Sequence, residues 1–163
     1  MKFYIIETDQ RNPLPDIRKM YSEIPVKYLV PEFAYKLQDD YVFEIITEDE
    51  TLLPDIFTVP FFMVKRDLFR VIMMYMPEIK AKYISLVDVK RERYETYVMP
   101  VLEMIDRRKL EEIDASDKLL FYVTDFYERY VVIRLDMLES FLRRDAMGVK
   151  AREFSINGEA SIW

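Results

Sequence analysis

The chain has 163 residues, of which 51% are hydrophobic and 33% are charged, and its 30 acidic and 24 basic residues give a net charge of −6. This composition is typical of a globular protein, and the length suits a single domain over residues 1–163. The acidic balance argues against nucleic acid as a partner, because phosphate binding needs a basic surface.

Missing residue types limit the chemistry further. The chain has no histidine and no cysteine, which removes the commonest general base near neutral pH, the usual ligands of structural zinc and any thiol nucleophile. Its two glycines, Gly148 and Gly158, stand too far apart for a phosphate-binding loop. We therefore predict no catalytic residues, no metal ligands and no cofactor. An enzyme would have to depend on carboxylates, lysine, tyrosine or magnesium.

No membrane or export signal is recognisable in the sequence. The longest apolar run, residues 57–64, falls far short of the roughly 20 residues that a membrane-spanning helix needs. The opening residues 2–7 are typical of a first β-strand and are too short for the apolar core of a signal peptide. Together with the absence of cysteine, these features predict a soluble cytoplasmic protein without membrane contact.

The first third of the chain is expected to begin and end with strands. Residues 2–7 and 41–47 are rich in β-branched and aromatic side chains, which favour strands. Prolines interrupt regular structure between them, and residues 31–37 suit one short helix with Pro31 at its first position. The acidic residues 48–51 are expected to form a turn.

The middle of the chain predicts a strand, a helix and a hairpin. Residues 56–64 are apolar and strand-like, although Pro60 indicates an edge or a bulge. A helix is predicted over residues 67–76, where apolar residues recur at the spacing of one helical face. Residues 82–89 and 94–102 are apolar runs joined by a four-residue charged tip, which predicts an antiparallel hairpin.

The last third continues in the same manner. Residues 107–118 are polar and indicate a surface connection, and strands are expected at residues 121–123 and 130–134. A second main helix is predicted over residues 136–146, with Gly148 as its left-handed cap. Together these elements predict an α+β fold with a mostly antiparallel sheet and a few helices.

One pattern occurs twice in the chain. Residues 62–69 and 131–138 align at an offset of 69, and both run from an apolar strand through a basic residue and an aspartate into an apolar helix. The strands that follow align at an offset of 70. We predict a strand–helix–strand unit at residues 61–86 and again at 130–156, arranged with approximate symmetry around a shared core. The alternative is chance similarity between amphipathic elements.

Asp67 and Asp136 occupy equivalent positions in the two units. Two carboxylates within several ångströms of each other would suit general acid and base catalysis. An aspartate before an apolar helical face also accepts backbone N–H bonds and suits the helix dipole. We favour the capping interpretation, so neither residue is predicted to be catalytic.

Two further groups have both a binding and a structural interpretation. Four methionines gather around the first helix: Met63, Met73, Met74 and Met76. They would suit an adaptable binding surface, but filling of the core is the favoured interpretation. The basic runs 107–109 and 143–144 would suit a phosphate or a partner's carboxylate, whereas basic residues also complement a helix C-terminus, which we favour.

Four segments spread over most of the chain carry a resemblance to a known family. They are residues 2–7, residues 60–64 leading into the first helix, residues 97–102, and residues 132–136 with the following helix and Gly148. Together they resemble a family of bacterial immunity proteins from polymorphic-toxin systems, the eleventh in that series and formerly a domain of unknown function. Residues 106–118 lie outside the resemblance.

The resemblance implies a stoichiometric inhibitor that binds and neutralises a cognate toxin, without catalytic residues of its own. A net charge of −6 would help to capture a basic toxin by long-range attraction. On charge alone, the acidic runs 48–50 and 111–114 are the expected places of contact. Two alternatives remain open. They are a small enzyme that uses carboxylates and magnesium, and a structural domain that self-associates through a sheet edge.

Overall fold

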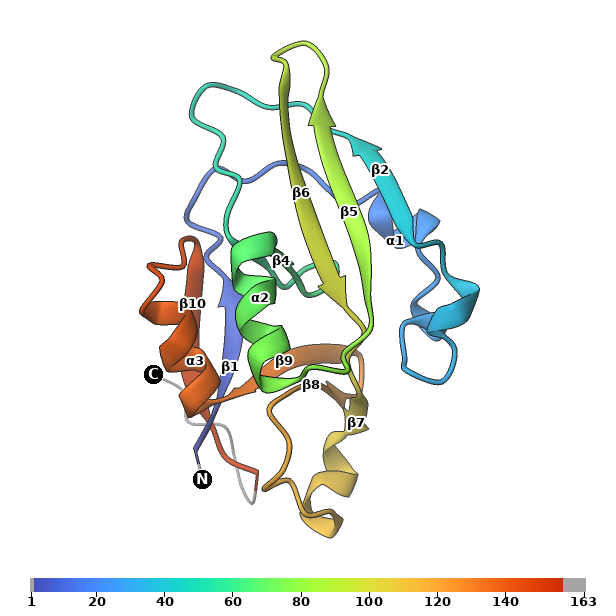
Figure 1. Cartoon of the computed structure of the whole chain (residues 1–163), viewed down its shortest axis with the longest axis vertical. Coiled ribbons are helices and arrows are strands. Elements are labelled where there is room, and N and C mark those ends of the chain that lie inside the picture. Colours follow the sequence, from blue (N-terminus) through green and yellow to red (C-terminus); the bar gives the residue numbers. More distant parts are fainter. Residues whose placement is uncertain (1, 157–163) are drawn as a thin grey trace.

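The computed structural model describes residues 2–156 of the protein (Figure 1). Within these residues the chain forms two five-stranded sheets and several short helices, which confirms the α+β class. Sheet A runs, in spatial order, β10 (Val149–Phe154), β1 (Phe3–Thr8), β9 (Glu128–Arg134), β8 (Leu120–Asp125) and β7 (Met104–Asp106). Sheet B runs β2 (Asp40–Glu44), β5 (Ala81–Asp88), β6 (Arg93–Pro100), β4 (Met63–Lys65) and β3 (Ile56–Phe57). The sheets are mostly antiparallel, as predicted, with parallel pairing at β7–β8 and β2–β5.

Short helices complete the fold. The two main ones are α2 (Arg66–Tyr75) and α3 (Leu135–Leu142), and α1 (Met20–Glu23) is a single turn. The 3-10 helices are η1 (Val26–Tyr28), η2 (Ala34–Lys36) and η3 (Arg107–Glu112). Over the described residues, every helix is too short or too polar to cross a membrane.

The two sheets share one apolar core. Helices α2 and α3 lie side by side (Figure 1) and pack into it through residues such as Ile72 and Met137. Val64 of sheet B and Ile133 of sheet A belong to the same cluster. A second cluster fills the opposite face of sheet B under the segment of α1, and a third lies on the opposite face of sheet A around Leu110 of η3. Each sheet therefore has an inner face toward the helices and an outer cluster of its own.

Both predicted units, residues 61–86 and 130–156, contain a strand, a helix and a strand in that order. The correspondence extends to the pairing between strands. Val98 of β6 lies between Val64 and Tyr83, and Tyr4 of β1 lies between Ile133 and Glu153. Ile133 follows Val64 by 69 residues and Glu153 follows Tyr83 by 70, which are the offsets of the sequence alignment.

Strand β1 thus lies between β9 and β10 in sheet A, just as β6 lies between β4 and β5 in sheet B. The hairpins β3–β4 and β8–β9 correspond as well, because Ile56 pairs with Val64 as Leu120 pairs with Ile133. Each unit is therefore a hairpin, a helix and two more strands, and the second unit is completed by the beginning of the chain. The sequence alignment did not predict this role for β1.

Two predicted strands differ clearly from the structure. The strand expected at residues 41–47 ends at Glu44. Beyond it, the backbone N–H and the hydroxyl of Thr47 donate to the Asp88 carboxylate at 2.8 and 2.5 Å, so this residue bonds a side chain of β5 in place of its backbone. The single strand expected at residues 56–64 is wrong, because the chain reverses between β3 and β4, with a cis peptide bond between Val59 and Pro60.

The predicted helices also need correction. Residues 31–37 contain only the 3-10 turn η2. The helix expected at residues 136–146 ends at Leu142. Three residues later, Asp145 adopts a left-handed backbone (φ 54°). The amides of Asp145 and Ala146 donate to the carbonyls of Leu142 and Phe141, which is a Schellman cap. Gly148, the predicted cap, instead lies before β10 with φ 79°.

Candidate functional site

The structure does not bring Asp67 and Asp136 together. Tyr75, at the end of α2, places its hydroxyl 3.3 Å from the carbonyl oxygen of Asp136 and 2.7 Å from the Ser140 hydroxyl. Asp67 lies eight residues earlier on α2, about 12 Å away along the helix. A carboxylate dyad is therefore excluded by the packing of the two helices.

The capping interpretation of these aspartates is correct in part, because both lie at helix starts and Asp136 accepts the backbone N–H of Met137 at 3.0 Å. The N-cap residues are Lys65 and Arg134, neither with a side-chain cap bond, and each aspartate is the second residue of its helix. Asp136 accepts a bidentate pair from the Arg134 guanidinium at 2.8 Å, which lowers the pKa of this carboxyl. Both carboxylates still lie in a first helical turn, where negative charge is favourable.

The methionines and basic runs divide between core and surface. Met63 is fully buried and Met76 packs against the shared core, but Met73 and Met74 are exposed, so core filling is correct only in part. Arg143 forms the C-cap of α3 and lies 3.7 Å from Glu139. The residues of run 107–109 form the first half of η3.

The acidic runs are exposed, but part of their charge is already paired. Arg91, at the β5–β6 tip, binds Asp49 and lies 3.5 Å from Glu48. In the other run, Asp114 accepts the backbone N–H of Ser116 at 2.9 Å. Contact through either run stays a prediction.

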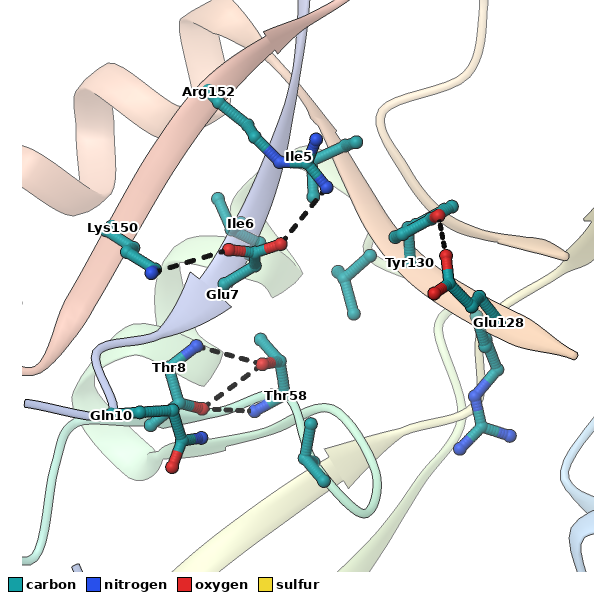
Figure 2. Close-up of a pocket in the computed structure, with 13 residues that line it drawn as sticks. Ile5, Ile6, Glu7, Thr8, Gln10, Thr58, Glu128, Tyr130, Lys150 and Arg152 are labelled. Atoms are coloured by element: carbon teal, nitrogen blue, oxygen red, sulfur yellow. Dashed lines mark hydrogen bonds and ion pairs between the residues drawn. The ribbon is translucent and has the colours of Figure 1, made fainter. Parts of the chain in front are cut away.

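A charged cleft of about 410 Å³ lies at the junction of the two sheets (Figure 2). Glu7 of β1 stands between Lys150 and Arg152 of β10, at 3.8 and 3.2 Å. The Tyr130 hydroxyl donates to Glu128, and this bond raises the pKa of Tyr130 to about 12. The ionic groups labelled in Figure 2, which are Glu7, Glu128, Lys150 and Arg152, therefore have partners within the cleft.

The remaining polar groups of the cleft fasten the two sheets to each other. Thr8 and Thr58 exchange hydrogen bonds through their backbone amides and hydroxyls at 2.8 to 3.1 Å. Arg129 donates to the Pro60 carbonyl at 2.6 Å, and its guanidinium stacks 4.8 Å from the ring of Tyr122. The Thr8–Thr58 and Arg129–Pro60 bonds join residues 50 and 69 positions apart in the sequence, so we interpret the cleft as a structural junction.

Sheet B, in contrast, leaves part of one face bare. In Figure 1 no helix covers β2, β5 or the upper part of β6 on the side where α2 lies. Eight residues of these strands lie on that side: Asp40, Val42 and Glu44 of β2, Tyr83, Ser85 and Val87 of β5, and Tyr94 and Thr96 of β6. We call these eight residues the open face. The next residue of β6 on this side, Val98, is already buried in the shared core.

Exposed apolar side chains lie on the open face around its polar middle residue, Ser85. Val42 is 70% exposed, Tyr94 72% and Tyr83 40%, although all three belong to regular strands. The opposite face of the same strands buries Tyr41, Phe43, Ile84 and Leu86 in the second core cluster. Strands with apolar residues on both faces are typical of sheets covered on both sides. The open face is therefore built like a covered surface.

Charges border the open face unequally. Asp40 and Glu44 flank Val42 on the edge strand β2, and the acidic run 48–50 follows. On the opposite side, a groove of about 580 Å³ separates the open face from Arg66 and Arg70 of α2. The edge strand thus presents negative charge beside apolar side chains, which suits a basic surface on a partner.

Among residues 2–156, no three acidic side chains converge on a point that could hold a metal ion. No protein-family model matches the chain, and a search of curated proteins finds no match.

Proposed function

We propose that this protein is a stoichiometric inhibitor that binds another protein through the open face, and that its target is a cognate bacterial toxin. The open face carries the first part of the proposal. Exposed Val42, Tyr83 and Tyr94 lie on strands whose other side is fully packed. Apolar area bordered by charge is typical of a protein-binding surface.

The toxin as target is supported by the resemblance to immunity proteins and by the acidic border. The chain carries a net charge of −6, and Asp40 and Glu44 place part of it beside the exposed Val42. Such an arrangement attracts a basic toxin at a distance and then lets apolar contacts hold it. Attraction of this kind weakens as salt rises.

Co-expression with the toxin encoded beside this gene tests the proposal. Cells should survive with the wild-type chain, and purified protein should form a one-to-one complex. Val42→Lys should weaken that complex at least tenfold, because it places an ammonium group within the apolar contact next to a basic partner. Val42→Thr is the matched control, since it keeps the β-branched shape and should bind within about threefold of the wild type.

The outcomes separate the proposal from its alternatives. Rapid cell death together with no complex would refute inhibition. Sedimentation of the isolated protein distinguishes self-association. A stable dimer that Val42→Lys converts to monomer would mean that a second copy covers the open face, which favours the structural alternative.

A further inference from the structure

The hairpin between β8 and β9 has a tip made of two bare aromatic side chains. Asp125 pairs with Glu128, so the turn itself consists of Phe126 and Tyr127. These two residues are 95% and 104% exposed. They therefore contribute almost no burial to the fold of the free protein.

The backbone of this turn is unfavourable for the residue that occupies it. Phe126 has φ 52°, in the left-handed region where bulky side chains are rarely found. Two-residue hairpin turns normally place glycine, asparagine or aspartate at such positions. Phe126 makes no packing contacts that would offset the cost of its strained backbone. Strained residues of this kind cluster at functional sites, which indicates a role in function.

The charge around the tip has one sign. Asp125 and Glu128 flank the two aromatic residues, and Glu128 is itself exposed. The adjacent cation, Arg129, is turned inward, where its guanidinium binds the Pro60 carbonyl and stacks on Tyr122 and Phe61. The tip thus presents two rings between two carboxylates.

We infer that the Phe126–Tyr127 tip is an anchor that inserts into an apolar pocket bordered by lysine or arginine on the partner protein. This inference rests on the proposed function, to which it adds a second point of contact. Aromatic residues that enter a pocket commonly dominate the affinity of an interface. The two carboxylates would pair with the basic border and guide the encounter.

The test uses the toxin encoded beside this gene, made inactive by a substitution in its own active site. The double variant Phe126→Gly with Tyr127→Ser should bind this toxin at least about 30-fold more weakly than the wild type. Tyr35→Ser is the matched control, because Tyr35 is an equally large aromatic residue that is 76% exposed on η2, in another part of the sequence, and the affinity should not change. Asp125→Asn should slow association and reduce its dependence on salt.

A second measurement does not need the toxin. Phe126→Gly alone should leave the melting temperature unchanged or raise it, because glycine relieves the left-handed strain. A fall of several degrees would give the tip a structural role and overturn the inference. Equal binding by the double variant and the wild type would also overturn it, while the proposed function would stand. A wild-type chain that fails to bind the toxin refutes the proposed function, and the inference with it.

Discussion

Gly148 lies where three segments of the chain meet, and Gly148→Ala should destabilise the protein by about 2–3 kcal/mol. Its carbonyl accepts the Asp9 amide at 2.7 Å, and the neighbouring Met147 exchanges bonds with Asp55 at 2.6 and 3.1 Å. With φ 79°, an alanine there costs about 1–2 kcal/mol in backbone strain. The added Cβ would lie 2.6 Å from the Pro54 Cβ, well inside normal contact distance.

To relieve the contact with Pro54, the segment around Gly148 must move, together with its hydrogen bonds to Asp9 and Asp55. Overpacking of this kind costs about 1–3 kcal/mol. The lower entropy of the unfolded alanine chain returns about 0.4–1 kcal/mol. For a protein of this size the net change corresponds to a fall of about 4–12 °C in melting temperature. Thermal and urea denaturation measure it. A change in stability of less than about 0.5 kcal/mol would refute the reasoning.

Gly148→Asn separates the two causes. Asparagine tolerates left-handed backbone better than alanine, but its Cβ meets the same Pro54 atom. The variant should therefore remain clearly less stable than the wild type. Full recovery with asparagine would show that the contact with Pro54 has no cost.

Three further changes test other parts of the fold. Tyr122→Phe should cost about 1–3 kcal/mol in urea denaturation, because the buried Phe62 amide loses the hydroxyl that accepts its hydrogen at 2.7 Å; a cost under 0.5 kcal/mol would contradict this. Asp145→Gly should stabilise the protein by up to about 1 kcal/mol, measured by the melting temperature, since its φ of 54° favours glycine; a loss would show that the side chain has a role of its own. The Thr47 hydroxyl lowers the pKa of Asp88 below its ordinary 3.8, so this carboxylate contributes stability above that pH and loses it as the pH falls through the lower folded value. Asp88→Asn should therefore be clearly less stable than the wild type at pH 7, with the difference shrinking in acid; a difference that does not change with pH would contradict the assignment.

Much of the fold could be predicted because its periodic signals are local. The apolar face of α2 and the paired runs of the β5–β6 hairpin are each visible within about 20 residues of sequence. The duplicated unit was visible for the same reason. The predictions failed where a distant residue takes part in the local structure, as Asp88 does where it binds Thr47 beyond the end of β2. Gly148 was assigned a left-handed backbone correctly, but the sequence did not show that the distant Pro54 leaves no room for a side chain there.

The surface features were harder to anticipate than the elements. The apolar residues on both sides of β2 and β5 are visible in the sequence, but only the tertiary structure shows which side α2 fails to cover. The Phe126–Tyr127 turn gave no signal at all, because glycine and asparagine are the residues by which such turns are recognised. The acidic runs were chosen by charge, and the structure pairs part of that charge with Arg91.

The place of β1 between β9 and β10 has a consequence for biosynthesis. Among the described strands β1 is synthesised first, yet Phe3 pairs only with Arg134 and Phe154. Sheet B can form as soon as residues 40–100 have emerged, whereas β1 must wait with both edges unpaired. The growing chain therefore exposes a short apolar strand until β9 and β10 have emerged, and sheet A is completed only when β1 is enclosed between them.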